Sequence, residues 1–118
     1  MSRLTKTYDL YEVVKVPFPF TDIHSTKVRP AIVISAQKFN AGIGSSILSM
    51  ITSLKPSKEL WPSDIEIEDL TSAGLPVPSI IRLKIFTLDH RLILLRLGHL
   101  SKTDQSQLQK KLRDVLSI

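Results

Sequence analysis

Two short stretches of the sequence carry polar side chains that suit phosphate chemistry. Arg29 precedes a proline and an apolar run, and Thr52 and Ser53 end another apolar run. A guanidinium can bind two phosphate oxygens through its planar fork, and a hydroxyl can orient the same phosphate. An arginine can equally pair with a loop carboxylate, and a Thr-Ser pair can form a turn. Spacing alone favours the structural explanation for each of these residues.

The other ionisable side chains offer fewer chemical possibilities. Arg82 and Lys84 alternate along a strand-like segment, so an exposed strand face would explain them. His24, His90 and His99 are widely separated, and we expect surface or loop histidines rather than metal ligands. The chain has no cysteine, which excludes a disulfide framework, a thiolate zinc site and a cysteine nucleophile. We therefore predict no metal and no cofactor.

The length of 118 residues suits one domain with a single core, spanning residues 1–118. Apolar residues make up 42% and charged residues 23%, as in soluble globular proteins, which argues against a largely disordered chain. No stretch approaches the roughly 18 uninterrupted apolar residues of a membrane span. The N-terminus lacks the apolar run of a signal peptide. We expect a cytoplasmic protein that does not enter a membrane.

The positive charge is concentrated in the C-terminal third. The net charge is +5, yet residues 1–78 carry eight basic and eight acidic side chains, whereas residues 79–118 carry eight basic and three acidic ones. A basic surface attracts polyanions such as nucleic acid or an acidic protein segment. A basic surface that only maintains solubility explains the charge equally well.

Hydrophobic periodicity predicts short strands followed by one helix. Strands are expected at residues 10–16, 30–35, 46–53, 64–68, 79–86 and 90–98, with single helical turns near 36–39 and within 69–79. Along 64–68 isoleucines alternate with acidic residues, so the acidic side chains should face water. Strands do not alternate with crossover helices. The pattern favours an α+β, mainly β fold built on a small barrel.

A C-terminal amphipathic helix should begin after Ser101, because Asp104 follows three residues later as in a capping box. Its apolar residues fall on one face, which should pack on the barrel: Leu108, Leu112, Val115 and Leu116. Its basic residues should stay in solvent: Lys110, Lys111 and Arg113.

Five ordered segments together resemble the MazF/PemK family of toxin endoribonucleases. They are VVKVPFPFTD, KVRPAIVIS, MITS, AGLPVPSIIRLKIFTLD and LGHLSKTDQSQLQKKL, and they run from about Tyr8 to the C-terminus. The resemblance implies an SH3-like barrel with added helices that forms a homodimer. It also implies a cognate acidic antitoxin and cleavage of single-stranded RNA without metal.

The same resemblance implies which residues act on RNA. The arginine of the RPA motif and the hydroxyl residues after the ITS strand correspond to Arg29, Thr52 and Ser53 as catalytic residues. Cleavage through the 2′-hydroxyl would leave a 2′,3′-cyclic phosphate and a 5′-hydroxyl. Five further residues are expected to contact RNA: Phe18, Phe20, Lys27, Arg82 and Lys84. Tyr8 and Trp61 are other candidate stacking residues, although core packing is expected for at least two of the four aromatic residues.

Two other functions fit the same resemblance. CcdB toxins share this fold and poison DNA gyrase, so the barrel alone does not separate a nuclease from a protein inhibitor. A degenerate toxin that retains only antitoxin binding is the second alternative. Neither the general base nor a role for Asp89 follows from the family motifs.

Overall fold

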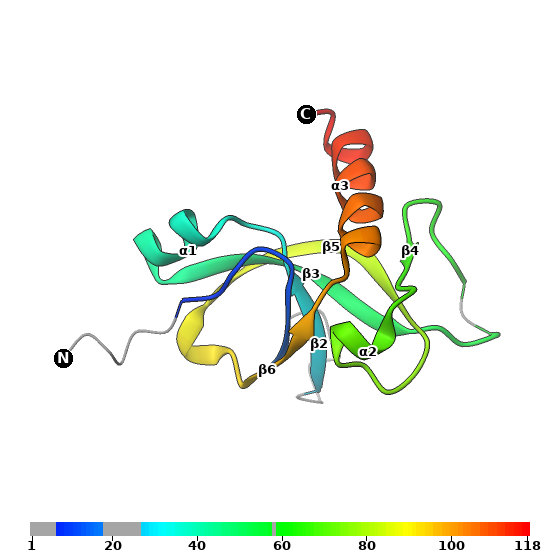
Figure 1. Cartoon of the computed structure of the whole chain (residues 1–118), viewed down its shortest axis with the longest axis horizontal. Helices are drawn as coiled ribbons and strands as arrows, with labels where there is room; N and C mark the ends of the chain where they lie inside the picture. Colours follow the sequence, from blue (N-terminus) through cyan, green and yellow to red (C-terminus); the bar gives the residue numbers. More distant parts are fainter. Residues whose placement is uncertain (1–6, 18–26, 58) are drawn as a thin grey trace.

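Among the described residues, 7–17, 27–57 and 59–118 of the computed structural model, one curled sheet of six strands forms the body of the molecule (Figure 1). In pairing order the strands are β4 (Ile65–Glu66), β5 (Ser79–Asp89), β3 (Ser45–Ser53), β2 (Val28–Val33), β1 (Glu12–Pro17) and β6 (Leu95–His99). Every neighbouring pair is antiparallel. The predicted mainly β, small-barrel fold is confirmed.

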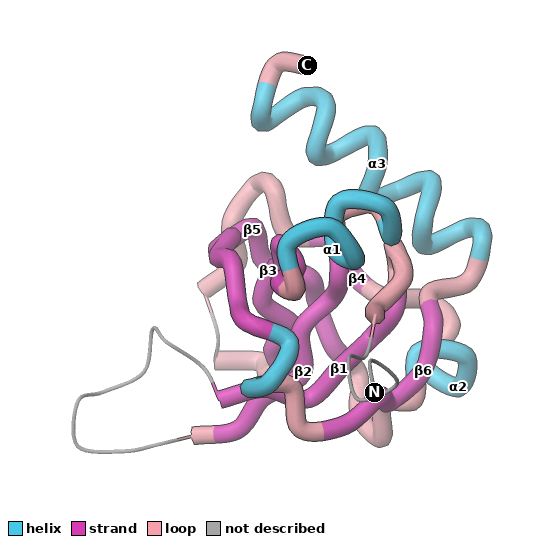
Figure 2. The backbone as a smooth tube through the Cα atoms, turned by 90° about the vertical axis from the view of Figure 1, so that its left-hand side faces the viewer, coloured by secondary structure: helices cyan, strands magenta, loops and turns pink. Residues whose placement is uncertain are grey.

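The helices lie at the rim of the sheet. They are α1 (Gln37–Ile43), α2 (Leu70–Ala73), the 3₁₀ turn η2 (His90–Leu92) and α3 (Lys102–Leu116). Helix α3 rises away from the sheet and ends free of it, as both views of the backbone show (Figures 1 and 2). Within the described ranges no helix is long and apolar enough to cross a membrane.

Two segments differ from the sequence prediction. Residues 90–98 are not one strand, because the side chain of Asp89 accepts a hydrogen bond from the Arg91 amide and starts the turn η2, so β6 begins only at Leu95. The single turn expected at 36–39 is the seven-residue helix α1. Buried Asn40 stabilises this helix by donating to the carbonyls of Tyr8 and Ser35. Tertiary contacts therefore outweigh the weak helix propensity of the segment.

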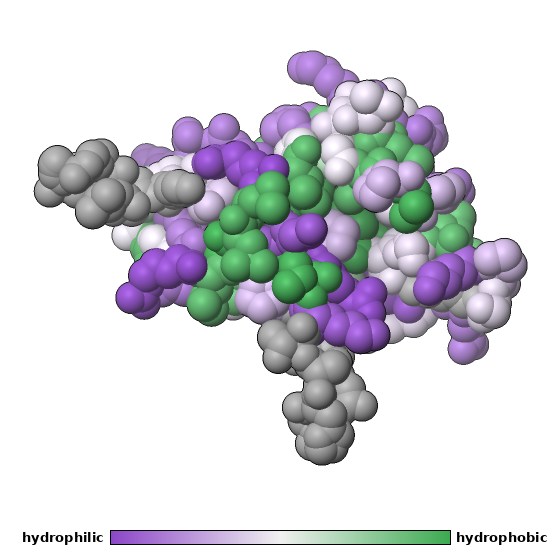
Figure 3. Space-filling model, turned by 90° about the horizontal axis from the view of Figure 1, so that it is seen from below, coloured by the Kyte–Doolittle hydropathy of each residue, from purple (hydrophilic) through white to green (hydrophobic). Residues whose placement is uncertain are grey.

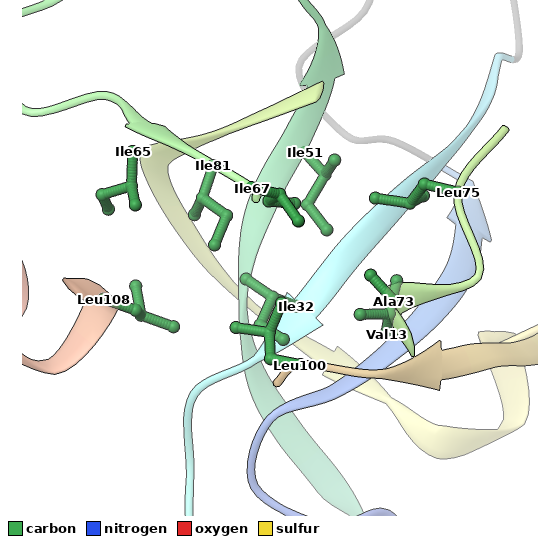
Figure 4. Packing of buried hydrophobic residues seen from close by; sticks show 10 residues of the cluster. All are labelled: Val13, Ile32, Ile51, Ile65, Ile67, Ala73, Leu75, Ile81, Leu100 and Leu108. Atoms are coloured by element: carbon green, nitrogen blue, oxygen red, sulfur yellow. The ribbon is translucent and has the colours of Figure 1, made fainter. Parts of the chain in front are cut away.

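A hydrophobic cluster covers each face of the sheet. Successive residues of a strand point to opposite faces, so neighbours in sequence pack in different clusters. Neighbours in β1 belong to different clusters: Val13 packs in the first core and Val14 in the second. The first core lies between the sheet, β4 and α3 (Figure 4), and its buried residues are Val13, Ile32, Ile51, Ile65, Ile67, Ala73, Leu75, Ile81, Leu100 and Leu108. The second consists of Tyr8, Val14, Val16, Ala31, Val33, Leu48 and Ile93.

A buried carboxylate fixes the start of α3. Ser101 caps the helix by accepting a hydrogen bond from the Asp104 amide at 3.2 Å, as the capping box predicts. The Asp104 carboxylate is fully buried and accepts from the amides of Glu68 and Asp69 at 2.9 and 3.0 Å. A buried carboxylate is tolerated because these donors replace its water. The contact joins α3 to the segment between β4 and α2.

The far half of α3 does not pack as predicted. Leu108 is fully buried and Leu112 packs against the first core. Val115 and Leu116 are 51% and 47% exposed, so the prediction that they dock on the barrel is wrong. The helix has extended beyond the surface that could cover them. Lys111, expected in solvent, is half-buried and donates to the Pro62 carbonyl at 3.1 Å.

Two glycines allow α2 to approach β6. A Cβ atom on Gly74 would lie 1.9 Å from the Leu97 carbonyl oxygen, and one on Gly98 would lie 2.4 Å from the Ser72 carbonyl oxygen. Gly74 also has a φ of +73°, which side chains disfavour. The close backbone contact holds α2 and the segment after it beside the ends of β2 and β3, where the candidate site lies.

Candidate active site

The strand register brings the two predicted catalytic positions together. Val16 of β1 pairs with Arg29 of β2, and Ala31 of β2 pairs with Met50 of β3. Continuing the second register by two residues places Arg29 opposite Thr52. The antiparallel sheet thus brings the RPA motif to the end of the strand that carries Thr52 and Ser53.

A pocket of about 680 Å³ opens at this edge of the sheet. Its volume lies in the range of small-ligand sites. Besides the three predicted catalytic residues Arg29, Thr52 and Ser53, its walls come from β1, β2, β3, β5, β6 and the α2 region: Lys15, Val28, Pro30, Ile51, Leu70, Thr71, Gly74, Leu75, Pro76, Val77, Ser79 and Leu97. Among the described residues, the charged side chains of this lining are Lys15 and Arg29, and none is a carboxylate. The pocket therefore suits an anion.

Arg29 has a polar atom that the described residues leave unmatched. The residue is half-buried, and its Nε is buried without a hydrogen-bond partner among the described part of the chain. A buried donor without a partner typically costs about 1–3 kcal/mol of stability, and more when it is charged. A phosphate oxygen bound in the pocket would supply the missing acceptor.

The hydroxyl groups of the pocket differ in their surroundings. Thr52 is 2% exposed and its backbone pairs with Ile80, whereas Ser53 is half-buried at the strand end. Ser79 is already engaged, because its hydroxyl donates to the Val77 carbonyl at 2.8 Å. Thr52 and Ser53 line the pocket with Arg29 at the end of β3.

Lys15 is the pocket residue that sequence reasoning missed. It lies in β1 between buried Val14 and Val16, and it is paired with Pro30 of β2 in the sheet. Its ammonium has no hydrogen-bond or ion-pair partner among the described residues. The available signal was a lysine within an otherwise apolar strand, but only the strand order shows that it reaches the Arg29 pocket.

Arg82 occupies a different environment from the one predicted. It is 9% exposed, and its guanidinium binds both carboxylate oxygens of Asp64 at 3.0 and 2.7 Å. The hydrogen bond to Asp64 raises the pKa of Arg82. The predicted exposed strand face is therefore wrong for Arg82, and the Asp64 side chain, expected in water, is only 5% exposed. Lys84 is half-buried nearby, with its ammonium 5.7 Å from the Trp61 ring centre.

The family of the chain follows from its sequence as a whole. Residues 10–116 match the PemK-like, MazF-like toxins of type II toxin-antitoxin systems. The chain belongs to this toxin family. None of the curated proteins matches the toxin at the level of sequence.

Solved structures share the fold of the toxin at low identity. A mycobacterial endoribonuclease in complex with its cognate antitoxin has a TM-score of 0.74 at 12% identity, covering 94% of this chain and 96% of that one. MazF from Deinococcus radiodurans has a TM-score of 0.74 at 18% identity, covering 96% and 99%. A MazE-MazF complex from the same organism has a TM-score of 0.69 at 20% identity, again covering 96% and 99%.

Among the described residues, the other predicted positions of the toxin are not part of the pocket lining. Lys27 is exposed directly before β2, while Phe18, Phe20 and His24 fall outside the described residues. Tyr8 is 2% exposed and belongs to the second core.

One histidine is not where the sequence predicted it. His90 is buried, its Nε2 lies 2.8 Å from the Ser46 hydroxyl, and its ring meets Tyr8 edge-on, so the prediction of a surface or loop histidine is wrong for it. His99 is exposed, as expected. The described residues contain no group of three or more candidate ligand side chains that could hold a metal ion.

Proposed function

We propose that this toxin is an endoribonuclease that cleaves single-stranded RNA with Arg29 and Thr52 at its active site. The observation that carries the proposal is the pocket in which Arg29, whose buried Nε has no partner among the described residues, lies beside Thr52 and Ser53. Structural relatives described as endoribonucleases support the same activity.

The proposed reaction uses the 2′-hydroxyl of the substrate as nucleophile. Its oxygen bonds to the adjacent phosphorus, the bond from phosphorus to the 5′-oxygen breaks, and the 2′-proton is lost while the leaving oxygen gains one. The products are a 2′,3′-cyclic phosphate and a 5′-hydroxyl. The transition state carries extra negative charge on the phosphate oxygens, so preorganised donors stabilise it more than the substrate.

Arg29 supplies the main positive charge to that phosphate through its planar donor fork. The hydroxyl of Thr52 orients the phosphate or the attacking oxygen, with Ser53 beside it. Lys15, the other cation of the pocket, adds a second positive charge. The described lining contains no carboxylate or histidine, and we assign no general base.

Other basic residues would extend the RNA path beyond the pocket. Lys27 is exposed next to β2, close in sequence to Arg29, and suits a contact with a neighbouring phosphate. Phe18 and Phe20 remain predicted stacking residues.

Protein partners of two kinds complete the proposal: a second copy of the chain and an acidic antitoxin. The relatives solved in complex with antitoxins support the second. Apolar side chains gather on the lower surface of the molecule (Figure 3). Three exposed leucines lie before and within β6: Leu92, Leu94 and Leu95. Patches of this kind mark protein interfaces. Light scattering at micromolar concentration should find a dimer, and the neighbouring reading frame should encode a small acidic protein.

Incubation of the purified toxin with a long mRNA in the presence of EDTA tests the activity. We expect cuts within single-stranded regions, with 5′ ends that a polynucleotide kinase can phosphorylate without prior dephosphorylation. Intact RNA across diverse sequences would contradict the proposal. It would favour the two alternatives, a protein inhibitor like CcdB or a toxin that retains only antitoxin binding.

A further inference from the structure

A hydrogen-bonded turn before β4 contains the single tryptophan of the chain. The Trp61 amide donates to the Asp64 carboxylate at 2.7 Å, and the Asp64 amide donates back to the Trp61 carbonyl at 3.0 Å. The two bonds close residues 61–64 into a turn. The position of the tryptophan backbone is therefore fixed by the same carboxylate that binds Arg82.

The guanidinium of Arg82 lies against the Trp61 ring. Its Cζ is 4.6 Å from the ring centre, within the range of a cation–π contact. The guanidinium is itself held by Asp64 and by the Glu59 carbonyl at 2.9 Å. Trp61 nevertheless remains 39% exposed. A large aromatic ring is thus held in place before any ligand binds, which lowers the entropy cost of stacking on it.

The arginine that holds this ring lies on the same sheet face as Thr52 of the pocket. Arg82 pairs with Met50, and Ile80 pairs with Thr52, so the side chains of Arg82 and Thr52 belong to one face of the β3–β5 ladder. The two pairs lie two residues apart along β3, roughly 7 Å. A strand of RNA with its phosphate at Arg29 and Thr52 can follow this sheet face toward Arg82 and the ring that it holds.

We propose that Trp61 is a stacking platform for a nucleobase of single-stranded RNA, next to the Arg29 pocket. The inference rests on the proposed function and adds a binding subsite to it. Every base has a face that stacks on an aromatic ring, and a nearby cation attracts the adjoining phosphate. Lys84 and Lys111 supply such charge beside the turn, while the Asp64 carboxylate is matched by Arg82. Glu59 is the other carboxylate near Arg82.

Tryptophan fluorescence reports on this subsite directly, because the chain contains one tryptophan. The probe is a single-stranded 2′-O-methyl oligonucleotide of mixed sequence, which binds like RNA but lacks the nucleophile for cleavage. Titration into the full-length toxin should quench the emission of Trp61. Anisotropy of a labelled copy of the oligonucleotide gives the dissociation constant in the same solutions.

Three variants test the contribution of the ring. Trp61→Ala should weaken binding by about 5- to 150-fold, the range measured for loss of one stacked base. Trp61→Phe keeps an aromatic face and should weaken it less. Phe39→Ala is the matched control, because Phe39 is similarly exposed at 43% but lies on α1, and it should leave binding unchanged. With cleavable RNA, Trp61→Ala should raise the half-saturating concentration and leave the single-turnover rate at saturation unchanged.

The outcomes separate the platform from the proposed function. Quenching and weaker binding by Trp61→Ala, in a toxin that cuts no RNA, would support the platform and overturn the nuclease. Normal cleavage, no quenching and unchanged binding by Trp61→Ala would overturn the platform alone and point to a protein contact at this turn. If Trp61→Ala fails to fold, quenching of the wild type and the Trp61→Phe affinity decide. An oligonucleotide that binds no form of the toxin overturns the platform.

Discussion

Arg29 and Arg82 are both strand arginines of the same sheet, yet the protein surrounds them in opposite ways. Arg82 has a carboxylate, a carbonyl and an aromatic ring around its guanidinium. Arg29 keeps a buried Nε without a partner among the described residues and lines a pocket that has a second cation and no carboxylate. Arg82 is buried and Arg29 is half-buried, but the matching of donors to acceptors is what separates their roles.

This difference predicts that one arginine mainly affects stability and the other mainly affects anion binding. A guanidinium whose donors are satisfied within the chain contributes mainly to stability, and its removal leaves an unpaired buried carboxylate. A guanidinium with unmatched donors contributes little to stability and is available to a bound anion. Stability and RNA cleavage should therefore respond to different arginines.

The largest effect on stability is expected for Arg82→Ala. Breaking a buried ion pair by removing one partner typically costs about 3–5 kcal/mol, because the other charge stays buried. Asp64→Ala should cost a similar amount in urea unfolding. The double variant Arg82→Met with Asp64→Leu should recover most of the loss. A free energy of unfolding that changes by less than about 1 kcal/mol in Arg82→Ala would place this pair with ordinary surface ion pairs.

The largest effect on cleavage is expected for Arg29→Ala. Removal of one preorganised donor to transition-state charge commonly slows a reaction by about 10²–10³-fold. Because the described residues supply no partner for the Arg29 Nε, the free energy of unfolding should stay equal or increase. Arg29→Lys should restore little activity, since an ammonium lacks the two-pronged geometry.

Single-turnover cleavage and urea unfolding on the same preparations check this separation. A folded Arg29→Ala toxin with full activity would end the assignment of Arg29 to the reaction. A destabilised but active variant would show that Arg29 has a structural partner and that the comparison with Arg82 is wrong.

Thr52→Val should have a smaller effect on the reaction. Loss of one neutral hydrogen bond is worth about 0.5–1.5 kcal/mol, or about 2- to 12-fold in rate. If the Ser53 hydroxyl substitutes for it, the double variant Thr52→Val with Ser53→Ala should lose more activity than the two single variants predict. Strictly additive losses in single-turnover rate would show that the two hydroxyls act independently.

Lys15→Ala should change how RNA binding depends on salt. For single strands, each neutralised phosphate contributes about 0.7 to the slope of log K against log salt concentration. If Lys15 contacts a phosphate, its removal lowers the slope by about that amount and weakens binding at low salt. Lys38→Ala, on exposed helix α1, is the matched control and should keep the slope of the wild type. Equal slopes in both variants would remove Lys15 from the RNA site.

Sequence reasoning found Arg29 and Thr52 because motifs at two strand ends carried them, and antiparallel pairing brings such ends together. It missed Lys15, because whether a lysine in an apolar strand reaches a pocket depends on which strands become neighbours. The pocket wall itself depends on the contact of Gly74 with the Leu97 carbonyl, which no local pattern indicates.

Hydrophobic periodicity predicted the exposure of individual side chains less reliably. The alternation that placed Arg82 on an exposed strand face does not reveal that Asp64, in the neighbouring strand region, covers that position. The apolar stripe of α3 is real, but its periodicity does not say where the barrel surface ends, so Leu116 lies uncovered. In both cases the pattern gives a direction for the side chain, and tertiary packing decides what lies there.

A third arginine, Arg91, extends the comparison to an exposed ion pair, and its replacement should have the smallest effect of the three. Its guanidinium pairs with Asp89 at 2.9 Å at the surface, where Arg91 is 89% exposed at its side chain. Hydrogen bonds from the Arg91 side chain and amide lower the pKa of Asp89 to about 2. Arg91→Ala removes the first of these donors, so the carboxyl pKa measured by NMR titration should rise toward the ordinary value of about 3.9.

The sign of the pH dependence follows from that shift. A carboxyl whose pKa is lowered by folding stabilises the native state above its unfolded pKa, and this contribution disappears as the pH falls from about 4 to about 2. At neutral pH the carboxylate is a weak base, which argues against Asp89 as the general base of cleavage. Asp89→Asn should therefore leave the pH profile of single-turnover cleavage unchanged between about pH 5 and 8. This is the range in which a general base of the reaction would be expected to titrate. An acidic limb that disappears in Asp89→Asn would assign the role of general base to Asp89 after all, and would show that a surface ion pair can also serve the reaction.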